Sequence, residues 1–195
     1  MIESAWLDIA PRISWSVATT QPRRRIFVVL LKADGLDDYE LPVSSINLRL
    51  RNVKASYVRV TVPNPTDHTD AILARTSGRM HILSGWLTDD GVRHLEELIY
   101  ANVQNVYFNQ GSSNVLILAG TRFMTRSNPR AAAIEGISQI RKTPAGKVAV
   151  TAPLDFFIQP GDVASAGDET FTVDYMGCVI LPPNAWMEIE GAANG

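Results

Sequence analysis

Apolar and polar residues alternate along much of this chain, which is the pattern of β-strands that bury one face. The alternation covers Arg12–Val17, Ile46–Leu50, Tyr57–Val62 and Thr170–Tyr175. A continuous apolar run, Ile26–Leu31, instead predicts a central strand that is buried on both faces. Strands of both kinds therefore dominate the predicted secondary structure.

Turn residues place hairpins between several of these strands. One hairpin is predicted around residues 52–56, and a second around Asn109–Asn114, between the strands Val103–Phe108 and Val115–Leu118. Near the C-terminus, Pro160-Gly161 predicts a type II turn, because proline presets φ near −65° and glycine adopts the positive φ that follows. The residues Ala166-Gly167-Asp168 predict another turn.

Helical spacing predicts two short helices in this strand-rich chain. Thr66 or Asp67 is placed to cap a helix over residues 71–74, which ends near Gly78. A second helix is predicted over Thr88–Tyr100, where apolar side chains recur at i, i+3, i+6 and i+7. Strands and helices do not alternate as βαβ units, so the fold class is mainly β with two short helices.

A polar segment divides the chain into two expected domains. Arg122–Arg130 contains threonine, serine, asparagine and proline, and is the best linker candidate. We expect an N-terminal β-barrel or sandwich over residues 1–121, a linker or arm over 122–131, and a small C-terminal antiparallel β-barrel over 132–195. The C-terminal unit is expected to contain a strand over Ile134–Ile140 with a bulge at Gly136, and a core that includes Phe157, Val163, Phe171, Val173 and Tyr175.

Composition narrows the class of protein. The 195 residues are 46% hydrophobic and 19% charged with a net charge of −2, which fits a soluble globular protein and gives no basic excess for nucleic-acid specificity. The apolar runs are far shorter than the roughly 20 residues of a membrane helix, so no membrane insertion is expected. The N-terminus lacks the basic region of a signal peptide. The single cysteine, Cys178, is flanked by apolar residues and is expected to be a buried, inert thiol.

The titratable residues do not form a recognisable catalytic, cofactor or metal motif. The three histidines, His68, His81 and His94, lack metal-ligand spacing. His68 with Asp67 and Asp70 leaves a cation site open, although the same residues suit a helix start. No nucleophile elbow or phosphate-binding loop is present. We therefore predict no enzymatic activity and no cofactor, and keep an enzyme with a dispersed site as the last alternative.

Aromatic and basic residues indicate a possible interaction surface. Trp6 and Trp186 lie near the two ends of the chain, where they serve either the core or a subunit interface. The basic run Arg23, Arg24 and Arg25 precedes the apolar strand and is either a solvated strand entry or a partner contact. These five residues are the candidate interface.

Two further stretches carry a resemblance. The first consists of Ser45–Arg51, Ala55–Asn64 and Asp70–Arg75, and the second of Ile158–Asp162, Glu169–Tyr175 and Met187–Glu190. Both resemble tail-tip or baseplate proteins of tailed bacteriophages, of the distal tail or hub kind. The resemblance implies strands, a short helix and a closing β-barrel that stack in rings, and it brings no catalytic residues with it.

The leading hypothesis is therefore a virion structural protein that forms a homo-oligomeric ring around the tail axis. It would be made in the host cytoplasm, reside in the virion tail, and contact other phage tail proteins of the tail tube, hub and baseplate. The alternative is a carbohydrate-binding β-sandwich module with exposed tryptophans as stacking platforms.

Overall fold

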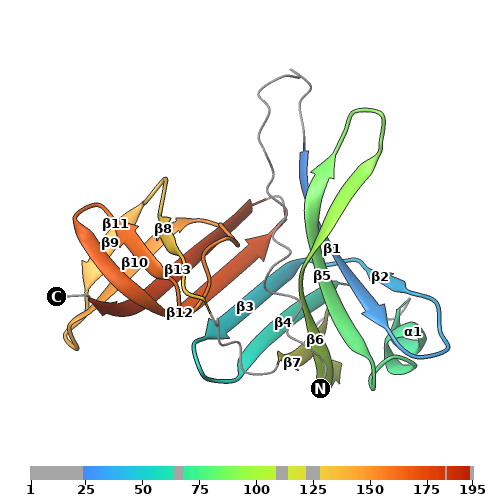
Figure 1. The fold of residues 1–195 in the computed structure, drawn as a ribbon. Coiled ribbons are helices and arrows are strands. Elements are labelled where there is room, and N and C mark those ends of the chain that lie inside the picture. The colour runs from blue at the N-terminus through green and yellow to red at the C-terminus, as the bar shows by residue number, and fades with distance from the viewer. Residues whose placement is uncertain (1–23, 64–67, 109–113, 122–127, 183, 194–195) are drawn as a thin grey trace.

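The structure is a computed structural model that describes residues 24–63, 68–108, 114–121, 128–182 and 184–193. These residues form one 13-stranded sheet and one short helix (Figure 1). The chain is therefore mainly β, as predicted, and its sheet is not closed into a single barrel.

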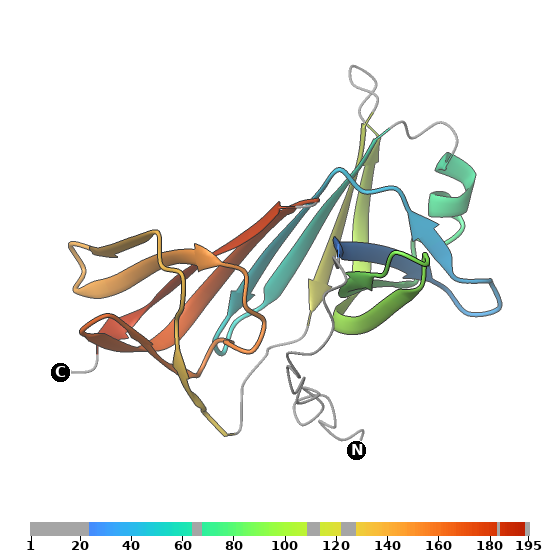
Figure 2. The same cartoon turned by 90° about the horizontal axis from the view of Figure 1, so that it is seen from above.

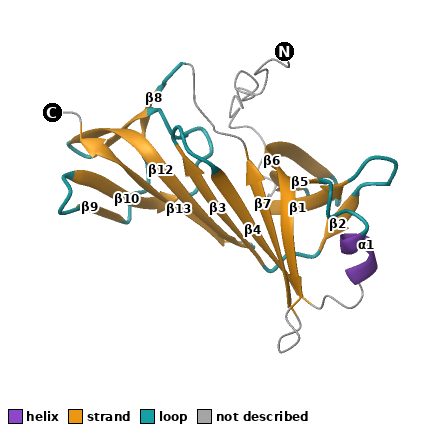
Figure 3. Ribbon diagram, turned by 90° about the horizontal axis from the view of Figure 1, so that it is seen from below, coloured by secondary structure: helices purple, strands orange, loops and turns teal. Residues whose placement is uncertain are grey.

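The strands are β1 (Arg24–Lys32), β2 (Tyr39–Leu41), β3 (Ser45–Arg51), β4 (Ser56–Pro63), β5 (Arg79–Leu87), β6 (Arg93–Phe108), β7 (Asn114–Thr121), β8 (Ala131–Ala133), β9 (Gln139–Lys142), β10 (Lys147–Pro153), β11 (Val163–Ala166), β12 (Glu169–Leu181) and β13 (Asn184–Ala193). The helix α1 (Thr69–Leu73) lies beside β2 (Figure 3).

The strand order is β2-β1-β5-β6-β7-β4-β3-β12-β13-β10-β9, and β11 pairs with β12 off this path. Neighbours along this order are antiparallel, whereas β8 runs parallel to β11. The sheet curls at both ends, so that an N-terminal lobe of β1, β2, β5 and β6 and a C-terminal lobe of β8–β13 flank the middle strands β3, β4 and β7 (Figure 2).

Bulges let two long strands serve a lobe and the middle of the sheet together. β6 has 16 residues, and it pairs with β5 up to Asn102 and with β7 from Asn102 onward. Its register shifts opposite Ile82/Leu83 and again between Val103 and Asn105. In β12 the register shifts between Val173 and Tyr175. A bulge bends its strand and increases the local twist, which rolls the sheet at these points.

The rolled N-terminal lobe is closed by an ion pair across its edge. β2 and β6 are separated in the sheet by β1 and β5. Nevertheless, Nη1 of Arg93 on β6 lies 2.8 Å from Oε2 of Glu40 on β2. Both side chains are half exposed, so the pair adds at most about 1 kcal/mol to stability. The pair shows that the sheet curls far enough to bring β2 and β6 together.

One face of the sheet, here called the inner face, forms a continuous hydrophobic core through both lobes. β3 and β4 bury alternate residues, as their sequence pattern predicts. The core residues with no exposed surface include Val29 of β1, Val60 of β4, Ile117 of β7 and Ile180 of β12. The core therefore continues through both lobes and the middle strands between them.

Several predicted elements are confirmed. The hairpins β3–β4 and β6–β7 are antiparallel as expected. Gly161 has a φ of 98°, and the Asp162 N–H donates to the Gln159 carbonyl at 3.0 Å, which fits the predicted turn. Gly167 has a φ of 58° between β11 and β12. The first predicted helix is α1, whose N-cap is His68; Thr66 and Asp67 lie outside the described residues, as does the predicted strand Arg12–Val17.

The second predicted helix is wrong, because Thr88–Tyr100 is a turn followed by the first half of β6. The Thr88 N–H donates to the Val92 carbonyl at 3.1 Å, and Gly91 has a φ of 80°. The bulge opposite Ile82/Leu83 places both Leu98 and Ile99 against the core. Two adjacent inward side chains interrupt the period of two and reproduce a helical spacing, and pairing with β5 overrides a weak helix preference.

The C-terminal lobe also differs from its prediction. The expected strand Ile134–Ile140 is replaced by β8 and β9 with a connection between them, and Gly136 has a φ of 64° in that connection. The connection still bonds to both flanking strands: the Ile134 N–H donates to Ser165 at 2.8 Å, and the Ser138 N–H to Thr151 at 2.9 Å. The connection thus carries the chain from β8, which is beside β11, to β9, which is beside β10.

The predicted linker lies partly outside the described residues. Residues 128–130 are not in a strand, and the Arg130 N–H donates to Asp162 Oδ1 at 2.9 Å, which fixes the entry to β8. The hydrogen-bonded sheet runs from the N-terminal to the C-terminal half through the pairing of β3 with β12. The expected linker at residues 122–131 therefore lies between two parts of the chain whose strands belong to one sheet.

The predicted C-terminal core is correct in part. Phe171 and Val173 are completely buried, but Val163 and Tyr175 are not part of the core, so their assignment to it is wrong. In β11 the buried positions are Ala164 and Ala166, and Tyr175 shares the face of the exposed Arg51. Phe157 is 45% exposed, so its assignment to the core is wrong. Its N–H donates to Asp155 Oδ1 in a turn, and the next residue, Ile158, takes the buried position.

Two phenylalanines provide a matched test of this lobe. Phe171→Ala should lower the free energy of unfolding by about 3–5 kcal/mol, because the ring is fully buried. Phe157→Ala removes a largely exposed ring and should cost about 1 kcal/mol or less. Urea unfolding followed by circular dichroism measures both values. Equal losses for the two variants would contradict the described packing.

Candidate interaction surface

The most distinctive surface in the described residues is the face of the sheet opposite the core, here called the outer face. Its side chains alternate with the buried ones along β3, β4, β7, β12 and β13, and they continue onto the second half of β6. The residues on this face are set by register, because a residue and its directly opposed partner share a face. The outer face can therefore be read strand by strand.

Three exposed arginines lie on the outer face of the middle strands. Arg49 and Arg51 are on β3, and Arg59 is on β4. Tyr57, which is 48% exposed, stands directly opposite Arg49. We call these four residues the arginine face. None of the three arginines forms an ion pair with another described residue.

Two glycines beside the arginine face receive side chains from their neighbours. At Gly177, which is opposite Arg49, a Cβ atom would lie 2.4 Å from the Tyr175 hydroxyl. At Gly120, which is opposite Tyr57, a Cβ atom would lie 2.2 Å from the amide nitrogen of Gln104. Burial, partly opposed by Arg49, raises the pKa of Tyr175. The side chains of Tyr175 and Gln104 therefore lie over these two glycines, against the surface of the sheet.

Apolar and aromatic side chains occupy the other end of the outer face. Tyr107 of β6 is 51% exposed, Leu181 of β12 is 43% exposed, and Trp186 of β13 is 38% exposed. Trp186 stands opposite Val179 of β12 and Pro153 of β10. Tyrosine, tryptophan and arginine are the residue types that dominate binding energy at protein interfaces.

The acidic residues at the C-terminal end of the outer face are already paired. Glu188 bonds with Arg141 of β9 at 2.5 Å. Lys147 lies 3.3 Å from both Asp174 and Glu190, and these hydrogen bonds raise the pKa of its ammonium group. Lys147 serves two carboxylates, so this end of the face keeps one acidic charge in excess, whereas the arginines of the middle strands form no ion pair with a described residue.

The structure describes the side chains of only two of the five residues that the sequence predicted as an interface, Arg25 and Trp186. Trp6 and Arg23 lie outside the described residues, as does the side chain of Arg24. Arg25 is half-buried, with its guanidinium 5.2 Å from the centre of the Phe27 ring. Burial lowers the pKa of Arg25, and the charge of Asp155 opposes this. Only Trp186 belongs to the outer face described above.

Sequence reasoning missed the arginine face, although its signal was present. The alternation of Arg49 and Arg51 with leucines was used only to predict a strand, and Arg59 and Tyr57 were interpreted in the same way. The sequence alone did not show which strands lie beside them. A polar face that carries one sign of charge without partners is the pattern that identifies such a surface.

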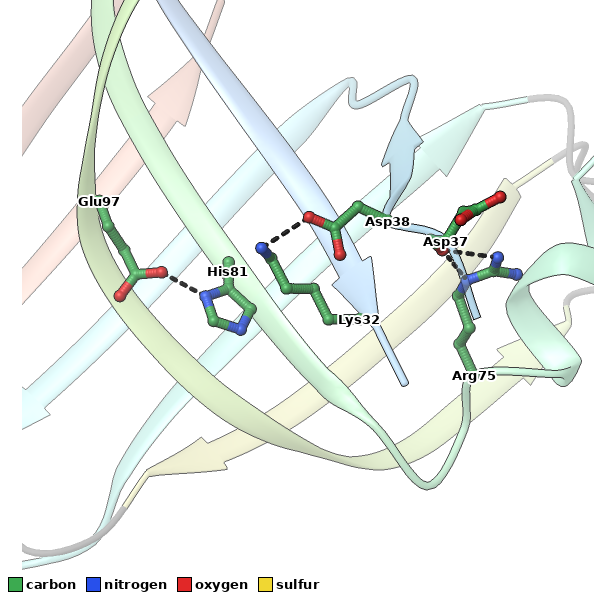
Figure 4. Close-up of polar contacts among 6 residues, drawn as sticks. All are labelled: Lys32, Asp37, Asp38, Arg75, His81 and Glu97. Carbon is green, nitrogen blue, oxygen red and sulfur yellow. Dashed lines mark hydrogen bonds and ion pairs between the residues drawn. The ribbon is translucent and has the colours of Figure 1, made fainter. Parts of the chain in front are cut away.

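A second polar cluster lies in the N-terminal lobe (Figure 4). Nδ1 of His81 on β5 pairs with Oε2 of Glu97 on β6, and these side chains are 14% and 21% exposed. The His81 ring stacks on Tyr100, with ring centroids 5.7 Å apart. The other carboxylate oxygen of Glu97, Oε1, is buried without a hydrogen-bond partner among the described atoms. The pair therefore depends on a single contact.

Beside this pair, charged residues fix the loop between β1 and β2. Lys32 Nζ lies 2.6 Å from Asp38 Oδ2. The Arg75 guanidinium donates to the Asp37 carbonyl at 2.8 Å and to the Ala71 carbonyl of α1 at 2.9 Å, and it stacks over Tyr39. The Tyr39 hydroxyl is 2.6 Å from Nδ1 of His68. These contacts tie the loop to the helix (Figure 4).

His68 thus contacts Tyr39, and Asp67, which the sequence hypothesis of a cation site also requires, lies outside the described residues. Within the described ranges, no group of three or more His, Cys, Asp or Glu side chains is arranged to hold a metal ion.

No described helix is long and apolar enough to cross a membrane. The sequence matches no protein-family model and no curated protein.

The His81–Glu97 pair can be tested by a double-mutant cycle. His81→Ala should lower the free energy of unfolding by about 1–3 kcal/mol, because it leaves a mostly buried carboxylate without its partner. The double variant His81→Ala/Glu97→Ala should lose less than the sum of the two single losses. Strictly additive losses in urea unfolding would show that the two side chains do not interact.

Cys178 provides a test of the core. The thiol is 1% exposed, and burial raises its pKa to about 12, so the thiol stays protonated at pH 8. A thiol-specific reagent should react with Cys178 only after the protein is unfolded. Rapid modification of the native protein would place the C-terminal half of β12 at the surface instead.

Proposed function

We propose that this protein is a structural subunit of a bacteriophage tail tip or baseplate, and that it forms a homo-oligomeric ring around the tail axis. The observation that carries the proposal is the outer face, where exposed tyrosine, tryptophan and unpaired arginine side chains lie on a sheet face. Such a face suits contact with another protein surface. The resemblance to phage tail proteins supports the same class, and it lies in β3, β4 and α1, in the turn before β11, and in β12 and β13.

The ends of the sheet support assembly as well. β2 and β9 are the two terminal strands of the sheet path, so each has one edge without a described strand neighbour. All four residues of β9 are exposed, and they include Arg141 and Lys142, which pair with acids of the same chain. Charged residues on an edge strand oppose unspecific pairing with strands of other molecules. Specific contacts between subunits are then made by other surfaces, such as the outer face.

In this function the subunit acts through the shape and position of the surfaces by which it contacts its neighbours. A contact that joins one surface to a different surface on the next copy closes into a ring when the rotation permits. Each interface should bury at least about 1,000 Å² in total. Neighbouring tail proteins, such as the tail tube, hub and baseplate, are the proposed partners, and the virion tail is the proposed location.

A carbohydrate-binding module remains the second candidate because Trp186 and Tyr107 are exposed on the outer face. Exposed aromatic rings serve as stacking platforms in such modules. The arginines on the middle strands favour the assembly function, since a neutral glycan provides no charge for them.

Sedimentation of the full chain over a range of concentrations, combined with electron microscopy, tests the proposal. A closed oligomer with rotational symmetry is expected. The variant Trp186→Ala/Tyr107→Ala should shift the population toward smaller species while keeping the far-ultraviolet circular dichroism of the parent. Trp186 and Tyr107 are exposed, so this substitution should leave the core intact. A monomer at all concentrations that binds a glycan array through Trp186 would favour the second candidate.

A further inference from the structure

We propose that the arginine face is the docking site for the acidic β1–β2 loop of a second copy of this chain. The interface would be head-to-tail, with the loop of each subunit seated on Arg49, Arg51 and Arg59 of the next. This inference rests on the proposed function, because it names the surfaces through which the oligomer forms. It also identifies the segment that binds to the arginine face.

The loop carries the charge that the arginine face lacks. It connects Lys32 to Tyr39 and contains Asp34, Asp37 and Asp38, all of which are exposed. Asp38 is paired with Lys32, but the carboxylates of Asp34 and Asp37 form no ion pair with another described residue. Leu36, at the centre of the loop, is 45% exposed. The loop thus presents two free acids around an apolar side chain.

The loop is ordered before any contact is made. The Leu36 N–H donates to the Ala33 carbonyl at 3.2 Å, which closes a turn. The Asp37 carbonyl accepts from two atoms of the Arg75 guanidinium, at 3.2 and 2.8 Å, and Lys32 holds Asp38 (Figure 4). A preorganised loop loses little conformational entropy on binding.

The two surfaces lie on different parts of the molecule. The loop is at the end of the N-terminal lobe that points away from the C-terminal lobe, whereas β3 and β4 lie between the lobes (Figures 1 and 2). A two-fold pair would exchange this contact reciprocally and stop at a dimer, whereas a head-to-tail contact repeats from copy to copy and generates a ring or a filament. The proposed ring requires the head-to-tail form, and native mass spectrometry distinguishes it from a dimer.

The composition of the two surfaces favours a second copy over nucleic acid. Nucleic acid would also neutralise the arginines, but the chain has a net charge of −2 and its other basic side chains near this face, Arg141 and Lys147, are paired with acids. The exposed Leu36 gives the loop an apolar contact for Tyr57 as well. Charge and apolar character therefore match on both sides of the proposed contact.

The other exposed acidic turn is a weaker match. Asp89 and Asp90 join β5 to β6. The Asp90 carboxylate already accepts from the Thr88 hydroxyl and the Val92 N–H, which lowers its pKa. This turn therefore supplies a matched control of the same charge and a similar exposure.

A charge-swap experiment tests the inference. The variant Arg49→Glu/Arg59→Glu and the variant Asp34→Lys/Asp37→Lys should each weaken self-association about tenfold or more, because attraction becomes repulsion. Mixing the two should restore association between unlike copies. The acidic loop of the first variant then meets the unchanged arginines of the second, and the lysine loop of the second meets the glutamates of the first. The measurements are sedimentation velocity and native mass spectrometry of the full chain at low and high salt. The association of the parent protein should also weaken as salt is raised.

Two controls accompany the swap. Arg130→Glu reverses an exposed arginine of the C-terminal lobe, and Asp89→Lys reverses an acid of the other turn; both should associate like the parent. Circular dichroism confirms that each variant is folded. Failure of the mixture to associate, or association of the swapped variants at parental strength, would overturn the inference.

The outcomes separate this inference from the proposed function. A parent protein that forms a ring but tolerates both swaps retains the proposed function and overturns the docking assignment. A parent protein that is monomeric under all conditions overturns both. Salt-sensitive binding of a short single-stranded DNA to the arginine face, without self-association, would replace the second copy with nucleic acid and overturn the inference.

Discussion

The apolar inner face of the sheet must be removed from water, and the described chain has only one five-residue helix with which to cover it. Burying apolar area stabilises a fold by about 25 cal/mol per Å². The sheet therefore has to cover itself. Bulges in β6 and β12 bend these strands, and the sheet curls on itself in the lobes on either side of its middle. The two lobes, the shared core and the exposed outer face all follow from this requirement.

The sequence predicted those parts of the fold in which the period of two is unbroken. β3 and β4 alternate strictly, and their hairpin was predicted correctly. The prediction failed where bulges change the phase. In β6 the bulge brings Leu98 and Ile99 to the same side, which produced the spacing of a helix. The position of a bulge depends on a partner strand, so the sequence of one strand does not reveal it.

The interaction surface was predictable to a smaller extent. Trp186 was identified from its residue type and is exposed on the outer face. Arg49 and Arg59 became significant only when register placed them on the same face of neighbouring strands, where neither forms an ion pair with a described residue. Their importance depends on the pairing of β3, which bonds to β4 on one side and to β12 on the other, across more than 100 residues of sequence. Long-range pairing of this kind is not visible in a local pattern.

The length of β6 gives the molecule a mechanical property. This strand bonds to β5 along its first half and to β7 along its second half. Antiparallel ladder bonds lie perpendicular to the strands. A pull along β6 therefore shears several bonds at once instead of opening them one by one. Tension applied at the tip of the β5–β6 hairpin would pass along one covalent chain into the middle strands, and the subunit would resist stretching in that direction more strongly than peeling at β2 or β9.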